Sequence, residues 1–260
     1  MDLIKWFKEI PTGIDGIPLP QDRIDTLEQI LLEKFNQENI IESVTRLKSK
    51  KNTVISLKIT PKASETTTLV AKMFIAGRFE NELSILKSSW SHGLAVPEVL
   101  EARDNVILMS FIPGETFVDR INHTFEPHLI DKLAKWYYNY HTAHKQIKGD
   151  PRLRNFICHD DQIFGVDFEE SCSGPWMLDI AGVSASLLDT NPVFDQRKRV
   201  LSWRFLESYL SLLGNKRDEA TDKEFISTLA DILKQTSVWR ESDRILDISE
   251  KIRVEGLPTD

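Results

Sequence analysis

The sequence lacks long apolar runs and is poor in cysteine. No stretch approaches the roughly 18 consecutive apolar residues of a membrane-spanning helix, so we expect no membrane span. Residues 1–8 also lack the apolar core of a secretory signal. The two cysteines, Cys158 and Cys172, are too few for a disulfide framework and form no Cys-x-x-Cys pair. We interpret both as small buried hydrophobic residues of a cytoplasmic protein.

The chain also lacks an excess of positive charge, because its 40 acidic residues outnumber its 33 lysines and arginines. The formal net charge of -7 argues against general affinity for nucleic acid, so we expect no nucleic-acid partner. The hydrophobic fraction of 41% and the charged fraction of 28% are typical of a globular protein. A chain of 260 residues is long enough for one large domain or two lobes.

Hydrophobic periodicity divides the chain into a strand-rich part and a helical part. Helices are expected at residues 1–10, 22–38 and 78–89 and, after Pro113-Gly114, around 129–140, 178–189, 194–213 and 221–250. Strands are expected at 40–47, 53–59, 68–74, 98–102 and 106–111, with a further pair at 156–157 and 163–168. This α+β pattern predicts an N-terminal helical extension (1–38), a strand lobe (39–112) and a mainly helical lobe (113–260).

Three polar residues come after the long helix of the second half at suggestive spacing. Asp150, Asn155 and Asp167 each lie beside an apolar run. Phosphoryl transfer needs a carboxylate to accept a hydroxyl proton and oxygen ligands to hold magnesium. Taken singly, Asp150 could start a turn, Asn155 could cap its neighbours, and Asp167 could cap the segment after its strand. Their combination favours a catalytic loop and a metal site.

A lysine and a glutamate in the strand-rich half complete this set. Lys72 interrupts an otherwise apolar strand, where an ammonium group needs a partner, unless it simply faces water at a sheet edge. Glu82 lies in the next helix and could form an ion pair with Lys72. Glu80 competes for this role, and a solvated glutamate is the simpler alternative.

Read in order, these segments resemble the protein-kinase-like superfamily. The likeness is greatest to its compact branch of aminoglycoside phosphotransferases, choline-kinase-like and lipopolysaccharide-sugar kinases, and RIO- and Bud32-type kinases. It covers about residues 40–188 and rests on six motifs in order. These are VAKMF, ENELSILKSSWSHGLAVPEVL, VILMSFIPGE, KGDPRLRNF, GVDFEE and WMLDIA.

The resemblance implies a bilobal kinase fold with a small antiparallel sheet lobe carrying one helix, a larger helical lobe and extra N-terminal helices. It also implies ATP and Mg2+ as cofactors. Asp150 would be the catalytic base, and Asn155 and Asp167 would hold magnesium. Lys72 would contact the phosphates, with Glu82 as its partner.

The same resemblance assigns the remaining nucleotide contacts. Met109 would lie near the gatekeeper position, and Ser110 and Ile112 would offer backbone groups to adenine. Lys50 and Lys51 would reach the phosphates as point charges.

The chain departs from the family pattern in three places. It has no Gly-x-Gly-x-x-Gly, because the turn at residues 48–52 reads Lys-Ser-Lys-Lys-Asn. Lys148 replaces the histidine that usually precedes Gly-Asp, and Glu169 replaces the glycine of Asp-Phe-Gly. The base and both magnesium ligands remain, so we expect an active enzyme.

The lengths of two loops indicate which class of acceptor the protein uses. Eleven residues separate Asp167 from Asp179, too few for a full activation loop, which favours a small-molecule acceptor over an extended peptide. Asp179 itself is expected to accept amides of the catalytic loop or to cap the next helix. Between Gly114 and Asp150, about 36 residues leave no room for a large helical insert. That compactness resembles RIO or Bud32 kinases, which act on proteins.

The sequence therefore predicts an ATP- and Mg2+-dependent phosphotransferase acting on a hydroxyl of a small molecule. Arg152 and Arg154 indicate an anionic acceptor, unless they form a solvated basic turn. One alternative is an atypical serine/threonine kinase of RIO/Bud32 type with a protein substrate. The other is a nucleotide-binding scaffold with little catalysis, which the glycine-free turn would favour.

Overall fold

The computed structural model describes Leu3, Trp6 and residues 18–35, 40–49, 51–60 and 65–259. The chain forms two compact units. The first comprises Met1–Trp90 and Pro97–Ile112, and the second comprises Ser91–Val96 and Pro113–Asp260. The helix expected at 1–10 lies largely outside the described residues.

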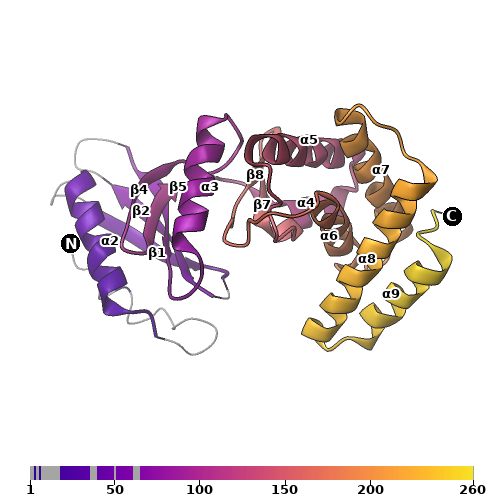
Figure 1. Ribbon diagram of the computed structural model, residues 1–260. Coiled ribbons are helices and arrows are strands. Elements are labelled where there is room, and N and C mark those ends of the chain that lie inside the picture. Colours follow the sequence, from indigo (N-terminus) through magenta and orange to yellow (C-terminus); the bar gives the residue numbers. More distant parts are fainter. Residues whose placement is uncertain are drawn as a thin grey trace. The chain divides into compact units, whose positions relative to one another are not determined.

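The first unit is built on a five-stranded antiparallel sheet in the order β1-β2-β3-β5-β4 (Figure 1). Its strands are β1 (Ile40–Leu47), β2 (Thr53–Thr60), β3 (Thr67–Met73), β4 (Val99–Arg103) and β5 (Val106–Ser110). Its helices are α2 (Gln21–Phe35) and α3 (Phe79–Ser91). All five strands fall where the sequence predicts them, because β-branched residues or alternating apolar and polar residues mark these segments.

Alternation along β3 sends its side chains to opposite faces of this sheet. Leu69, Ala71 and Met73 are buried in the same core as Leu27 and Leu31 of α2. Lys72 points to the other face, where it meets α3. The α2 helix thus covers one face of the sheet, and α3 supplies a polar partner on the other (Figure 1).

The second unit is mainly helical. Its helices are α4 (Phe117–Thr124), α5 (Pro127–His144), α6 (Met177–Leu188), α7 (Gln196–Leu212), α8 (Glu219–Arg240) and α9 (Asp243–Glu255). A small antiparallel sheet comprises β6 (Glu115–Thr116), β7 (Phe156–His159) and β8 (Gln162–Gly165), preceded by the 3-10 turn η1 (Leu153–Asn155). The α+β, two-lobed fold class predicted from the sequence is confirmed.

Three local expectations are corrected in this unit. The helix expected at 221–250 is two helices, because Glu241 takes a left-handed conformation with φ 50° and the Ser242 side chain caps α9. The N-cap of α8 is Asp218, whose carboxylate accepts the Thr221 amide, so α8 begins at Glu219 rather than at the expected residue 221. Cys172 is exposed and Cys158 is half buried, whereas the sequence predicted that both are buried.

An aromatic cluster fixes α5 against the small sheet. Trp136 stacks on Tyr140, and its indole nitrogen donates to the Ala95 carbonyl at 3.0 Å. The Trp136 ring occupies space that a side chain at Gly165 would need, because a Cβ there would lie 2.2 Å from the ring. Phe168 stacks on both Trp136 and Tyr140, which places the end of β8 beside α5. Among the described residues, no helix is long and apolar enough to cross a membrane.

Candidate functional site

In the first unit, Lys72 and Glu82 form a buried ion pair. Lys72 Nζ lies 2.6 Å from Glu82 Oε2, and the two side chains are 7% and 2% exposed. Lys72 lies in mid-β3, opposite Val54 and Ile107, and Glu82 lies in the first turn of α3. Glu80, the alternative partner, is exposed, so Lys72 pairs with Glu82 rather than with Glu80. Burying two charges is costly, and replacing a buried pair by apolar residues is often neutral or stabilising. A functional role is therefore a better explanation than stability.

A side-chain latch holds the turn between β1 and β2. Asn52 is fully buried, and its Oδ1 accepts the amides of Ile75 at 2.9 Å and Ala76 at 3.3 Å. These amides come directly after β3, so the latch ties the glycine-free turn to the segment next to Lys72. Lys51 is exposed beside the latch, and Lys50 lies outside the described residues.

The end of β5 positions the residues assigned to adenine. Met109 is buried between Val70 of β3 and Val99 of β4. The Ser110 amide donates to the Glu98 carbonyl at 2.9 Å, and the Ser110 hydroxyl accepts the Glu98 amide at 2.9 Å. The Ser110 amide is therefore already engaged. Ile112 lies beyond the strand and is half buried.

In the second unit, Asp179 organises the start of the loop that carries the candidate base Asp150. Its carboxylate accepts the Lys148 amide at 2.6 Å and the Gly149 amide at 3.1 Å, as the sequence predicts. The same carboxylate contacts His141 Nε2 at 2.9 Å, and His141 Nδ1 lies 2.7 Å from the Tyr209 hydroxyl. Gly149 has a φ of 78°, and a Cβ there would lie 2.1 Å from the Glu170 carbonyl oxygen, so this position requires glycine.

Lys148 is fully buried, and its ammonium group lies inside the loop. Nζ donates to the Asp167 carbonyl at 2.7 Å and to the Asp150 carbonyl at 3.1 Å. It also lies 5.1 Å from the Phe168 ring centroid and 5.5 Å from that of Phe156. The Lys148 ammonium group therefore links the backbone of Asp150, the candidate base, to the backbone of Asp167, a candidate metal ligand.

Asp150 is held by an arginine of its own loop. Arg152 Nε donates to Asp150 Oδ1 at 2.5 Å, and Arg152 Nη2 contacts Asp150 Oδ2. Burial alone would raise the pKa of Asp150, but the hydrogen bond from Arg152 and the charge of Lys148 lower this pKa to about 2. Asp150 is thus ionised throughout the physiological pH range.

The two candidate metal ligands are neighbours of Asp150 in the second unit. Asn155 is buried at the end of η1, and its Nδ2 donates to the Asp150 carbonyl at 3.4 Å. The Asn155 carbonyl accepts the Val166 amide at 2.9 Å, which brings it beside Asp167. Asp167 has a φ of 63°, a strained conformation typical of functional positions. Amide and carboxylate oxygens are the ligands that magnesium prefers, so these residues fit that ion.

The structure thus joins Lys72 with Glu82 in the first unit and Asp150, Asn155 and Asp167 in the second. The sequence did not assign a role to Asn52, and it did not predict that the Lys148 ammonium group donates to two backbone carbonyls. The one sequence feature that set Lys148 apart was its position, because the family pattern has histidine there. Asn52 gave no signal, because a turn asparagine is common.

Comparisons with known proteins agree on the fold. The family model described as the RIO domain matches residues 38–173. No curated protein sequence matches the chain.

Several solved structures are similar across nearly their whole length. The choline/ethanolamine kinase family protein of Mesorhizobium loti is 12% identical with a TM-score of 0.59, over 91% of this chain and 92% of that one. The amicoumacin kinase hAmiN, solved with AMP-PNP, Ca2+ and Ami, is 14% identical with a TM-score of 0.61, over 92% and 97%. The choline kinase of Cryptosporidium parvum is 10% identical with a TM-score of 0.60, over 90% and 94%.

Proposed function

Because the chain belongs to the RIO domain family, we propose that it is an ATP- and Mg2+-dependent phosphotransferase that acts on a hydroxyl of a small molecule. The observation that carries the proposal is the buried 2.6 Å pair between Lys72 and Glu82. It is supported by contacts in the second unit, where the Lys148 ammonium donates to the Asp150 and Asp167 carbonyls and the Asn155 side-chain amide donates to the Asp150 carbonyl.

Each residue has a role that its surroundings fit. Lys72, oriented by Glu82, contacts the nucleotide phosphates. Asn155 and Asp167 would hold magnesium, which would neutralise charge on the transferred phosphoryl group. Asp150 orients the acceptor hydroxyl and accepts its proton.

The low pKa of Asp150 defines how it acts. A carboxylate with a pKa of about 2 is a weak base. It therefore takes the proton only once the hydroxyl oxygen has begun to bond to phosphorus, and until then its main effect is positioning.

The segment after Asp167 favours a small acceptor. Phe168 is buried, the Ser171 amide donates to the Phe168 carbonyl at 3.1 Å, and Cys172 pairs with Ile147 in an antiparallel bridge. This short, pinned segment offers no long surface to an extended peptide. The structural neighbours named for choline, ethanolamine and amicoumacin point the same way.

The direct test is a screen of hydroxylated metabolites for magnesium-dependent ADP formation by the purified protein. Asp150→Asn is expected to lower kcat by about 10²–10⁴-fold, as for loss of a positioned base. Asp161→Asn is the matched control, because Asp161 is an exposed aspartate of the β7–β8 turn in the same unit. If the wild type neither binds ATP nor turns it over, the proposal is wrong.

A protein acceptor is the second candidate, favoured by the RIO domain match. It predicts that a co-purifying protein becomes phosphorylated in the presence of ATP and that this labelling disappears in Asp167→Ala. Labelling of such a protein without turnover of any small molecule would select this candidate over the first.

A further inference from the structure

We propose that Arg154 and Arg240, beside the catalytic loop, bind the phosphate monoester of a small hydroxylated acceptor. This inference rests on the proposed function and names the acceptor class for that same site. The acceptor would hold one hydroxyl at Asp150 and its existing phosphate group at the two arginines.

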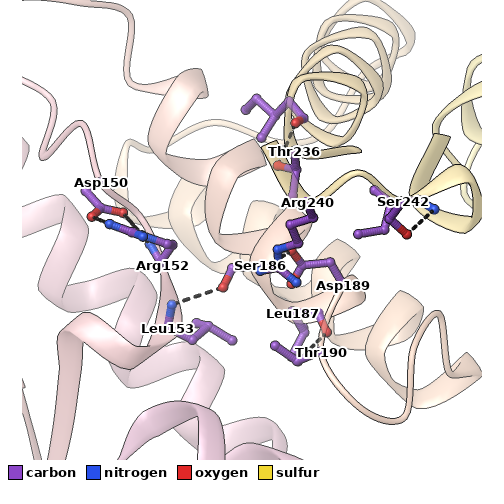
Figure 2. A network of polar contacts seen from close by, with 12 residues as sticks. Asp150, Arg152, Leu153, Ser186, Leu187, Asp189, Thr190, Thr236, Arg240 and Ser242 are labelled. Carbon is purple, nitrogen blue, oxygen red and sulfur yellow. Dashed lines mark hydrogen bonds and ion pairs between the residues drawn. The ribbon is translucent and has the colours of Figure 1, made fainter. Parts of the chain in front are cut away.

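The two arginines are brought to one place by the loop, α6 and α8. The Leu153 amide donates to Ser186 Oγ of α6 at 3.1 Å, which docks the catalytic loop on that helix (Figure 2). Asp189 comes directly after the last residue of α6, and Arg240 is the last residue of α8. Arg240 Nη2 lies 2.8 Å from Asp189 Oδ2, so the end of α8 meets the end of α6 beside Leu153 (Figure 2).

Three arginines gather at this place. Arg152 is matched by Asp150 and Arg240 by Asp189. Arg154 is exposed and has no ion pair within the described part of the chain. The charges of Arg152 and Arg240 oppose that of Arg154, and those of Asp150 and Asp167 partly offset them. An anion bound at Arg154 would reduce the remaining repulsion between these like charges.

Asp189 is an incomplete counter-ion for Arg240. Its side chain is 5% exposed, and its Oδ1 is buried without a hydrogen-bond partner among the described residues. Burial raises the pKa of Asp189 to about 6, against the opposing charge of Arg240. The Arg240 side chain is 46% exposed and meets Asp189 through Nη2, so an anion can reach the same guanidinium group from solvent.

The arrangement suits a phosphate better than a carboxylate. A planar carboxylate is saturated by the fork of one arginine, whereas a tetrahedral phosphate presents three oxygens to donors from different directions. Here the guanidinium groups come from two separate elements, the catalytic loop and α8.

The test uses inorganic phosphate and the matched probes glycerol 3-phosphate, glycerol and glycerate. Binding is measured by calorimetry, in nucleotide-free protein and again with saturating AMP-PNP and magnesium. We expect inorganic phosphate to bind in both conditions and glycerol 3-phosphate to bind about tenfold or more tightly than glycerol or glycerate. Arg154→Gln and Arg240→Gln should each weaken both phosphate ligands by about tenfold.

Two further variants make the result specific. Arg253→Gln is the matched control, because Arg253 is an exposed, ion-paired arginine of α9, and it should bind phosphate as the wild type does. Asp189→Asn removes a competing negative charge and should tighten phosphate binding by a few-fold. A merely structural role of the Asp189–Arg240 pair would instead weaken it.

The proposal is overturned if inorganic phosphate does not bind, or if neither arginine variant changes its affinity. It is also overturned if a phosphoserine peptide binds more tightly than glycerol 3-phosphate, which would assign the site to a phosphorylated protein. Failure of AMP-PNP to bind would refute the proposed function. The titrations without nucleotide would still show whether Arg154 and Arg240 bind phosphate.

Discussion

Replacing Lys148 by methionine tests the central contact of the catalytic loop. Methionine keeps the length and apolar stem but removes the ammonium that joins the Asp150 and Asp167 carbonyls. Hydrogen bonds to a charged group contribute about 1.5–3 kcal/mol each. A cation near an aromatic face adds about 0.5–2 kcal/mol, and Lys148 lies near two such rings.

These gains are opposed by the several kcal/mol that an ammonium group loses when it leaves water. The variant avoids that cost but leaves two carbonyls without their donor, at about 1–3 kcal/mol each. The expected net loss is about 3 kcal/mol in the free energy of unfolding. It is measured as a lower urea midpoint with an unchanged m-value.

The catalytic effect should be larger than the stability loss alone explains. Small misplacements of reacting groups can cost about 100-fold in rate. We therefore expect kcat to fall about 100-fold, with the KM for ATP within about threefold of wild type, at a temperature where the variant is fully folded.

Lys198→Met is the control for this experiment. Lys198 is also fully buried, and its Nζ donates to the Thr190 carbonyl at 2.7 Å and to the Thr190 hydroxyl at 3.0 Å, away from Asp150 and Asp167. It should lose comparable stability while kcat changes less than about threefold. Equal losses of kcat in the two variants, or full activity of Lys148→Met, would refute the positioning role.

Three further changes probe other contacts. The folded-state pKa of Asp189, about 6, lies above its ordinary 3.8, so the contribution of Asp189 to stability falls as pH rises from about 4 to 6. Urea titrations should show Asp189→Asn gaining stability relative to the wild type over that window, and no gain would contradict the burial. Gly182→Ala would place a Cβ 2.2 Å from Pro151 Cγ, so it should cost about 1–3 kcal/mol and lower kcat despite the better helix propensity of alanine. Asn52→Ala leaves the Ile75 and Ala76 amides without their acceptor and should cost about 1–3 kcal/mol by thermal unfolding; an unchanged melting temperature would show that the latch is dispensable.

The sequence predicted the strands and the main polar residues because their signals are local. The strand β2 alternates at period two, β5 is a short apolar run, and Lys72 stands out because it interrupts the apolar residues of β3. Asp150, Asn155 and Asp167 likewise lie in one short loop and the hairpin that follows it. Their proximity therefore depends on local structure and can be predicted from their spacing in the sequence.

Features that depend on tertiary contacts could not be predicted in this way. The end of α8 is set by one left-handed residue, Glu241, which carries no strong turn signal. The meeting of Arg240 with Asp189 joins residues far apart in the sequence, and helix packing alone brings them together. The Asn52 latch is non-local in the same sense.

The contacts of Asp179 have a consequence for the timescale of motion in the catalytic loop. The Lys148 and Gly149 amides are held by a carboxylate that also contacts His141 of α5, which in turn contacts Tyr209 of α7. Because three helices share this network, we infer that these amides exchange their hydrogens with solvent only when the second unit unfolds. The loop would then act as a fixed template, and the slow steps of a catalytic cycle would lie in the arrival and departure of ligands.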